Sequence, residues 1–330
     1  MSGIEIITEP ATGSAIAQKL VHKSDADEVF LTFWRRTGPD SFSVTAHWPS
    51  DRPFYRAADG GFEPLLVTET VRQLFPLICH VGYDTPFDHH LVWESYRYEL
   101  DPAVLRCDGG PIELELRVVC SELVHRRSHL AGMTMDVDLL RDGNRLASAC
   151  SRFTVQAHGI YVRLRGGNSD SIQAMAAAPA APEGISAEYA GRPDRADVVL
   201  SDIPPGGRPE AISGAIPEPI PEAMADGMPE AAAGNLRAWW LRVDTAHRKF
   251  FDHPVDHAPG MLLLEAARQA ARAALHPLPA LPVAMSAAFH RYVDLDAPCR
   301  ITARVESPAL VRVTAEQHGR LCFTADVGAA

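Results

Sequence analysis

The sequence predicts an α+β protein made of two copies of one unit, each with a single long helix and an antiparallel sheet. Three observations support this prediction. Short segments recur in the same order in the two halves of the chain, strand candidates alternate apolar with polar residues, and one segment in each half has the apolar pattern of an enclosed helix. With 330 residues, the chain is long enough for two domains that each bury a core.

The repeat rests on four pairs of matching segments. In order along the chain, residues 28–32 match 197–201, residues 64–73 match 260–269, residues 97–102 match 291–298, and residues 141–146 match 316–321. The common order of these matches indicates a duplicated unit. We therefore predict an N-terminal repeat over 1–166, a linker over 167–188 and a C-terminal repeat over 189–330, with a mobile Pro-rich insertion at 203–235.

Each repeat is expected to begin with two strands, continue with the helix and end with several strands. Residues 41–48 alternate with the period of a half-buried strand. Pro64 occupies a favoured first helical position, and the residues after it leave little polar surface, so this helix should be enclosed. Further strands are expected at 91–100, 112–120, 133–140 and 146–155, with a hairpin turn at Asp142 and Gly143.

Composition excludes several classes of protein. The formal net charge of −11 disfavours nucleic acid and anionic membranes as partners. The chain has no apolar run long enough for a membrane span and no signal-peptide pattern near its start. Its six cysteines lack a C-x-x-C pair, which fits reduced thiols and predicts a cytoplasmic protein. Nucleotide-binding glycine motifs and the G-x-S-x-G motif of serine hydrolases do not occur.

Each expected helix carries a polar triad on one face. With spacing i, i+3 and i+4, the triads are Glu69, Arg72 and Gln73 in the first repeat and Glu265, Arg268 and Gln269 in the second. One interpretation is a buried ion pair that fixes the helix orientation, because an unpaired buried charge is costly. The other is a pocket floor, in which the carboxylate is a general base or hydrogen-bond acceptor and the guanidinium holds an oxyanion or phosphate.

A histidine-containing loop precedes the second helix. His253 and His257 each follow an aspartate, and Glu265 lies downstream on the first turns of the helix. A loop histidine facing a helix carboxylate suits proton transfer at neutral pH. Structural histidines are the alternative interpretation. A metal site is not expected, because Pro254 and Pro259 disfavour a regular helical pair of histidine ligands.

These segments resemble the A-factor biosynthesis hotdog family, the γ-butyrolactone synthases of actinomycete signalling. The resemblance rests on residues 251–260 followed by 262–270 in the second repeat, and on residues 21–23, 28–32, 64–73, 130–133 and 190–201 elsewhere. It implies a tandem hotdog fold, in which each repeat is a curled antiparallel sheet around a central helix. The insertion at 203–235 departs from the family pattern.

The resemblance also implies an activity. Family members transfer a β-ketoacyl group from an acyl carrier protein to the hydroxyl of dihydroxyacetone phosphate, and the ester cyclises to a butenolide phosphate. Reduction and dephosphorylation then give diffusible signals that control antibiotic production. A coenzyme A thioester is a possible acyl donor as well. No cofactor is required, because the thioester is already activated.

In this interpretation Glu265 is the base or positions the hydroxyl, and Arg268 anchors the phosphate or oxyanion. Glu69 and Arg72 would form the partner half of the pocket, and Gln73, Gln269, His253 and His257 would bind substrate. The protein would be a monomeric pseudo-dimer or a homodimer. Two alternatives remain open: a hotdog thioesterase or dehydratase, and a non-catalytic regulator that binds a small molecule.

Overall fold

The structure is a computed structural model that describes residues 16–57, 60–107, 109–127, 129–203, 235–278 and 280–330. It divides into two compact units, with residues 1–56, 60–94 and 98–161 in the first and residues 57–59, 95–97 and 162–330 in the second. The exact repeat boundaries at 166 and 189 stay a prediction. The proposed linker at 167–188 includes a short helix, and the insertion at 203–235 lies outside the described residues except for its two end residues.

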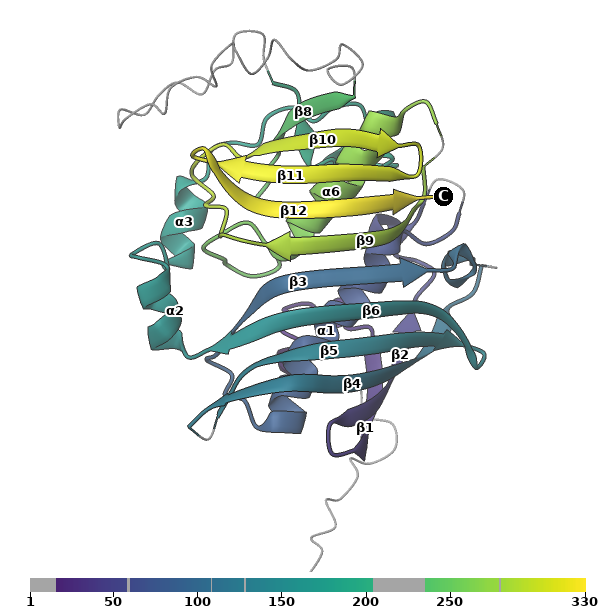
Figure 1. Ribbon diagram of the computed structural model, residues 1–330, viewed down its shortest axis with the longest axis vertical. Coiled ribbons are helices and arrows are strands. Elements are labelled where there is room, and N and C mark those ends of the chain that lie inside the picture. Colours follow the sequence, from purple (N-terminus) through teal and green to yellow (C-terminus); the bar gives the residue numbers. More distant parts are fainter. Residues whose placement is uncertain (1–15, 58–59, 108, 128, 204–234, 279) are drawn as a thin grey trace, which may run out of the picture. The chain divides into compact units, whose positions relative to one another are not determined.

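The first unit has the predicted order of elements (Figure 1). Its strands and long helix are β1 (Leu31–Gly38), β2 (Ser41–Trp48), α1 (Pro64–Tyr83), β3 (His90–Leu100), β4 (Ile112–Arg126), β5 (His129–Arg141) and β6 (Asn144–Gln156). The short helix α2 (His158–Leu164) begins in this unit and ends in the second. The predicted strand at 41–48 and the helix start at Pro64 are confirmed. Strands β4 and β5 are longer than predicted: β4 continues through residues 121–126, which are exposed or half-buried, and β5 begins four residues earlier, at His129.

The second unit repeats this order. Its elements are α3 (Ser171–Ala177), α4 (Ala187–Ala190), β7 (Leu200–Ser201), β8 (Leu236–Leu241), α6 (Gly260–Leu275), β9 (Pro282–Phe289), β10 (Arg300–Ser307), β11 (Leu310–Gln317) and β12 (Arg320–Ala329). Within the first repeat the strands lie in the order β1-β2-β4-β5-β6-β3, and within the second in the order β7-β8-β10-β11-β12-β9. The two orders are the same topology, which confirms the duplicated α+β unit.

Matching hairpin turns show how closely the repeats agree. Asp142 and Gly143 join β5 to β6, and His318 and Gly319 join β11 to β12. All four residues have positive φ, from 51° to 77°. Turns of this kind follow the right-handed twist of the flanking strands and therefore fix their register. The predicted turn at Asp142 is confirmed.

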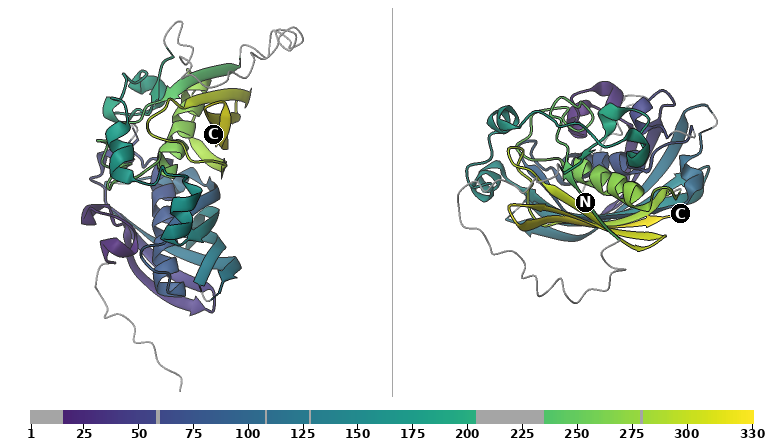
Figure 2. Two further views of the ribbon diagram at one scale, coloured as in Figure 1. Left: turned by 90° about the vertical axis from the view of Figure 1, so that its left-hand side faces the viewer. Right: turned by 90° about the horizontal axis from the view of Figure 1, so that it is seen from above.

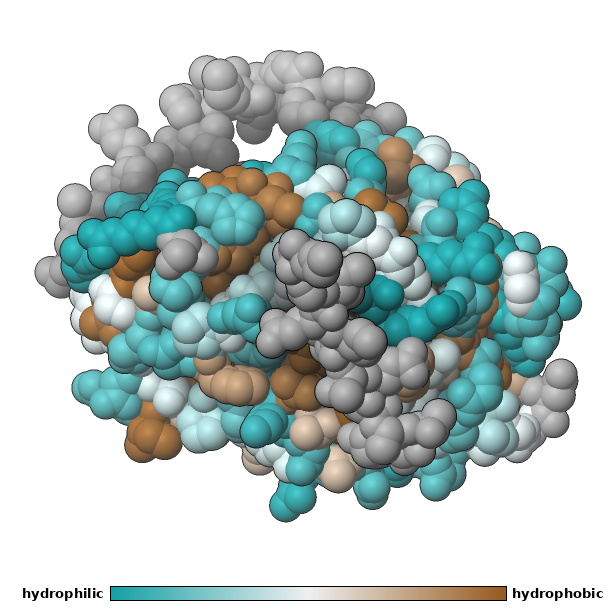
Figure 3. All heavy atoms as spheres, turned by 90° about the horizontal axis from the view of Figure 1, so that it is seen from below, coloured by the Kyte–Doolittle hydropathy of each residue, from teal (hydrophilic) through white to brown (hydrophobic). Residues whose placement is uncertain are grey.

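The long helix of each repeat lies against one face of its sheet, as Figure 2 shows for α6. Sixteen of the twenty α1 residues are buried, since strands and connecting segments enclose the helix. The apolar side chains of α6 are likewise buried, including Leu262, Leu264 and Ala270 at below 2% exposure. Outside this core, the face drawn in Figure 3 is mainly hydrophilic, with smaller hydrophobic areas between. Five of the six triad residues, all but Arg72, are at most 2% exposed and therefore lie inside the two cores.

Candidate functional site

Helix α6 places its triad on the buried face. Glu265 is fully enclosed, and both oxygens of its carboxylate accept hydrogen bonds from Arg268, each at 2.8 Å. Gln269 donates to Oε1 of Glu265 at 2.6 Å. Arg192, which follows α4, adds a second guanidinium at 2.7 Å from the same oxygen. The structure thus brings the three predicted residues together and adds a cation that the helix pattern did not reveal.

Gln269 also joins the helix to the segment before β7. Its Oε1 accepts a hydrogen bond from the backbone N–H of Val199 at 2.9 Å, and its Nε2 donates to the carbonyl of Asp197 at 2.8 Å. One side chain therefore satisfies two backbone groups that the strand ladder does not reach. This geometry supports a positioning role for Gln269.

The first repeat has the same arrangement around Glu69. Arg72 donates to both carboxylate oxygens at 2.8 Å, and Gln73 donates to Oε1 at 2.9 Å. Lys23 supplies the second cation at 3.0 Å. Gln73 again spans two backbone groups, accepting from the N–H of Phe30 and donating to the carbonyl of residue 28.

Lys23 and Arg192 are the site residues that sequence reasoning missed. Each stands five residues before the acidic residue that opens the first matching segment, at Glu28 and Asp197 respectively. The signal was therefore present as a basic residue at equivalent positions of the repeat. Sequence reasoning treated these residues only as part of the family resemblance, because nothing local to them indicates a carboxylate partner.

The two helix carboxylates remain ionised at neutral pH. Burial alone would raise the pKa of Glu69, but the positive charges of Arg72 and Lys23 outweigh it and lower that pKa to about 2. Burial likewise opposes ionisation of Glu265, and the charges of Arg192 and Arg268 lower its pKa to about 2. A carboxylate with so low a pKa is a weak proton acceptor and a strong hydrogen-bond acceptor.

The predicted loop histidines each pair with the preceding aspartate. His253 Nδ1 contacts the carboxylate of Asp252, and half of the His253 side chain is exposed. His257 Nδ1 lies 2.7 Å from Oδ1 of Asp256, which is 7% exposed. Within the described ranges, no group of three or more His, Cys, Asp or Glu side chains is arranged to hold a metal ion.

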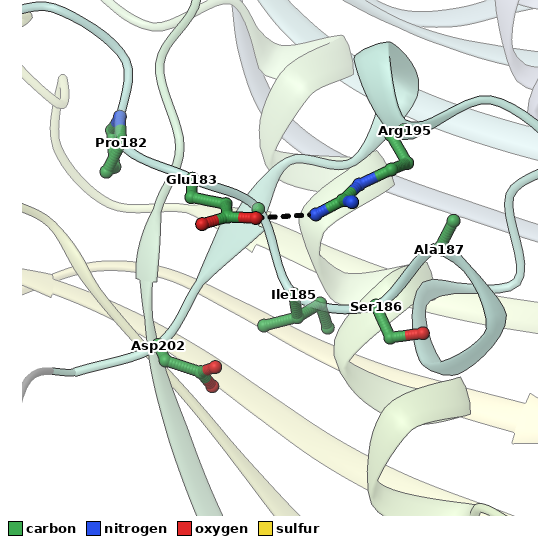
Figure 4. A pocket seen from close by; sticks show the side chains of 8 residues that line it. Pro182, Glu183, Ile185, Ser186, Ala187, Arg195 and Asp202 are labelled. Carbon is green, nitrogen blue, oxygen red and sulfur yellow. Dashed lines mark hydrogen bonds and ion pairs between the residues drawn. The ribbon is translucent and has the colours of Figure 1, made fainter.

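An open pocket of about 750 Å³ lies elsewhere in the second unit (Figure 4). Its wall includes Ile185, Ser186 and Asp202, and an exposed ion pair joins Glu183 to Arg195 at 2.7 Å. Exposed ion pairs contribute little binding or stability. None of the predicted site residues lines this pocket, so it is separate from the polar triads.

Two repeats of identical topology, each with one helix enclosed by an antiparallel sheet, define a tandem hotdog protein. The chain belongs to the A-factor biosynthesis hotdog domain family, whose model matches residues 8–157 and again residues 174–329. The predicted fold and family are therefore confirmed. Among the described helices, none combines the length and the apolar character needed to cross a membrane.

Curated relatives match nearly the whole chain. A protein of Streptomyces virginiae named 2-oxo-3-(phosphooxy)propyl 3-oxoalkanoate synthase is 35% identical over 96% of this chain and 97% of its own length. A protein of Streptomyces coelicolor with the same name is 35% identical over 94% of this chain and 90% of its own length. Among solved structures, the 12:0-ACP thioesterase from Umbellularia californica aligns with 90% of this chain and 99% of its own, at 11% identity and a TM-score of 0.47.

Proposed function

We propose that this protein is an acyltransferase that joins a β-ketoacyl thioester to dihydroxyacetone phosphate, the first step in making a γ-butyrolactone-type signal. The observation that carries this proposal is the full-length match to two synthases of one name. In that name, a 2-oxo-3-(phosphooxy)propyl group is dihydroxyacetone phosphate bound through its hydroxyl oxygen, and a 3-oxoalkanoate is a β-ketoacyl group. An ester between the two is the product of the proposed transfer.

The reaction has two stages. The hydroxyl oxygen of dihydroxyacetone phosphate attacks the thioester carbonyl, its proton leaves, and the carbon–sulfur bond breaks to release a thiol. The ester then closes by an intramolecular aldol condensation, which expels water and gives a butenolide phosphate. Three protein functions are needed: a proton acceptor near the hydroxyl, donors for the developing oxyanion, and a cation for the phosphate.

The roles of the triad residues are part of this proposal. Glu265 has two candidate roles, the base and the group that positions the hydroxyl. Its lowered pKa and its two guanidinium partners support the positioning role. Glu69 has equivalent partners and takes the equivalent role in its repeat. Gln269 and Gln73 act by holding the segments that carry Val199 and Phe30 against their helices.

Arginine is suited to phosphate because its planar guanidinium donates two parallel hydrogen bonds. The side chain of Arg72 is 21% exposed, whereas that of Arg268 is 2% exposed. Arg72 is therefore the better placed of the two for direct contact with a phosphate. Arg268 is buried against Glu265, so it acts on the phosphate or oxyanion through its positive charge and not by direct contact.

The acyl donor and the state of the protein belong to the same proposal. We infer that the thioester is presented by an acyl carrier protein, with coenzyme A as the alternative carrier. The duplicated unit supports a protein that is complete as a monomeric pseudo-dimer, with a homodimer as the alternative. We also infer a cytoplasmic location, where thioester and dihydroxyacetone phosphate are both made.

Mass spectrometry of the purified protein with a β-ketoacyl thioester tests the function. The substrate is offered on coenzyme A and on an acyl carrier protein, each with and without dihydroxyacetone phosphate. We expect a phosphorylated ester or butenolide only when both substrates are present. Free acid released at the same rate without dihydroxyacetone phosphate would instead indicate a thioesterase. Binding of either substrate without turnover on either carrier would indicate a non-catalytic regulator.

A further inference from the structure

Asp256 lies between a histidine and an arginine in the second unit. Its Oδ1 is 2.7 Å from Nδ1 of His257, and its Oδ2 accepts a hydrogen bond from Nε of Arg165 at 2.8 Å. Asp256 and Arg165 are each 7% exposed, whereas the His257 side chain is 28% exposed. A buried carboxylate and guanidinium thus support a histidine that reaches solvent.

Arg165 is held in place by three further contacts. Its Nη2 donates to the backbone carbonyl of Asp256 at 2.9 Å and to Oδ1 of Asp294 at 2.7 Å. The central carbon of its guanidinium lies 4.5 Å from the centre of the Tyr292 ring. Gln317 fixes the backbone of Asp294 with two hydrogen bonds of 2.9 Å. Segments far apart in the chain therefore converge on Arg165, and its hydrogen bond orients the Asp256 carboxylate.

The contact with Asp256 selects the tautomer of His257. A carboxylate only accepts hydrogen bonds, so Nδ1 carries the proton and Nε2 of the neutral ring keeps its lone pair. The ring of Tyr292 packs edge-on against His257, with ring centres 4.7 Å apart. Burial raises the pKa of Tyr292 to about 12 despite the opposing charge of Arg165, so its phenol stays neutral beside the imidazole.

The first repeat provides an internal comparison. Because residues 64–73 match 260–269, the positions of Asp256 and His257 correspond to Gly60 and Gly61. The next residue of each loop makes a similar backbone hydrogen bond. The N–H of Phe62 donates to the carbonyl of Leu105, and the N–H of Ala258 donates to the carbonyl of Val293, each at 2.8 Å. In the first repeat the loop is filled by buried aromatic residues, namely Phe54, Tyr55 and Phe62. The unit therefore folds without an aspartate and histidine at this place.

We propose that His257 is the general base of the acyl transfer, with Asp256 and Arg165 as its positioning residues. This inference rests on the proposed function. Nε2 of His257 takes the proton of the dihydroxyacetone phosphate hydroxyl as its oxygen bonds to the thioester carbon. When the carbon–sulfur bond breaks, the imidazolium returns that proton to the leaving thiolate. The histidine is neutral again after each transfer, and the products are the ester and a thiol.

Steady-state kinetics of His257→Gln and Asp256→Asn test the assignment in the full-length protein. For His257→Gln we expect kcat to fall by about 10²- to 10⁴-fold, the usual contribution of a positioned base, while the KM for dihydroxyacetone phosphate changes by less than about threefold. Asp256→Asn should also lower kcat with little effect on KM, because the histidine remains but loses its fixed tautomer. His290→Gln, an exposed histidine of the same repeat that contacts Thr324, is the matched control and should keep wild-type kinetics.

A second measurement separates proton transfer from a merely structural role. His257→Gly reproduces the glycine found in the first repeat, and added imidazole should restore part of its activity. The acid limb of the pH profile of kcat should disappear in His257→Gln, although Asp256, Arg165, Asp294 and Tyr292 still surround the position. Full activity of His257→Gln would overturn the assignment. So would a result in which His253→Gln loses activity and His257→Gln does not. A wild-type protein without transferase activity would instead remove the proposed function, and this role with it.

Discussion

At the scale of single residues, the main feature is a buried carboxylate with more than one cation. One arginine three residues along a helix is the simplest partner for a buried glutamate. Both Glu69 and Glu265 have that arginine and a further cation from a distant segment. Together the charges of the two cations outweigh the effect of burial and lower the carboxyl pKa. The second cation also ties the helix to the segment before the first strand of its repeat.

Removing the charge of Glu265 should therefore destabilise the protein. In Glu265→Gln, Arg192 and Arg268 would keep their buried charges without a carboxylate between them. We expect the free energy of unfolding to fall by about 3–5 kcal/mol, as for other broken buried ion pairs. Urea denaturation followed by circular dichroism measures this change. Glu306→Gln, on the exposed surface of β10, should change stability by less than about 0.5 kcal/mol, and equal effects of the two substitutions would contradict the prediction.

The same carboxylates predict how stability depends on pH. Their pKa in the folded protein is about 2, below the ordinary value of 4.5 that applies to the unfolded chain. The unfolded state therefore binds protons first as the pH falls, and stability decreases between about pH 4.5 and about pH 2. Above pH 4.5 this contribution is fully present.

Denaturation series at several pH values test this dependence. Each carboxylate can contribute a slope of up to about 1.4 kcal/mol per pH unit. Other acidic groups also titrate in this range, so the informative quantity is the difference between wild type and Glu265→Gln. We expect the variant to lose stability less steeply below pH 4.5. Parallel curves for the two proteins would show that Glu265 titrates normally when folded.

At the scale of elements, a close approach of α4 to α6 makes the second cluster possible. Helix α4 ends at Gly191, whose φ is 66°, and the next residue is Arg192. A Cβ atom at Gly191 would lie 2.1 Å from Nε of Arg272 on α6. The glycine therefore lets the turn pass close to the helix, so that the Arg192 side chain reaches Glu265.

Gly191→Ala should cost more stability than a glycine substitution that changes backbone strain alone. Gly319 is a matched control, because its φ is also 66° and a Cβ there would meet nothing within 4 Å. We expect Gly319→Ala to lower the free energy of unfolding by about 1–2 kcal/mol. Gly191→Ala should lower it further, because Arg272 must move as well. Thermal and urea unfolding of both variants give the comparison, and similar costs would mean that Arg272 adapts freely.

At the scale of the whole molecule, the reactivity of the six cysteines depends on how tightly the two cores are packed. None of the six forms a disulfide in the structure. Cys79, Cys120, Cys299 and Cys322 are buried, whereas Cys107 and Cys150 are partly exposed. Burial raises the pKa of Cys120 to about 11 and also raises that of Cys79, Cys299 and Cys322. Buried thiols of raised pKa react slowly, since the thiolate is the nucleophile.

Thiol titration with a chromogenic disulfide reagent should therefore find two classes of cysteine. In the native protein we expect rapid reaction at Cys107 and Cys150 only, and in denaturant at all six. Substituting Cys107 with serine should remove one rapidly reacting thiol without changing the slow class. Rapid reaction of four or more thiols in the native protein would contradict the packing described for the two repeats.

Patterns in the sequence were enough to predict the duplicated unit, the order of its elements and the residues on each helix face. Spacing between nearby residues was enough to predict the strand at 41–48, the helix from Pro64 and the matching triads. Such patterns are local, because a helix face or a strand face is set by the backbone of the segment itself. The outer end of β4 was missed because residues 121–126 are exposed or half-buried and leave no apolar alternation in the sequence.

The pairing of charged side chains, by contrast, depends on the folded chain. Arg192 reaches Glu265 across 73 positions of sequence, and Arg165 reaches Asp256 across 91. No local pattern links an arginine to a carboxylate so far away in the sequence. The fold selects the partners because a buried charge is tolerated only where an opposite charge lies within hydrogen-bond distance. The ionisation of the helix glutamates and the orientation of His257 therefore depend on contacts that exist only in the folded chain.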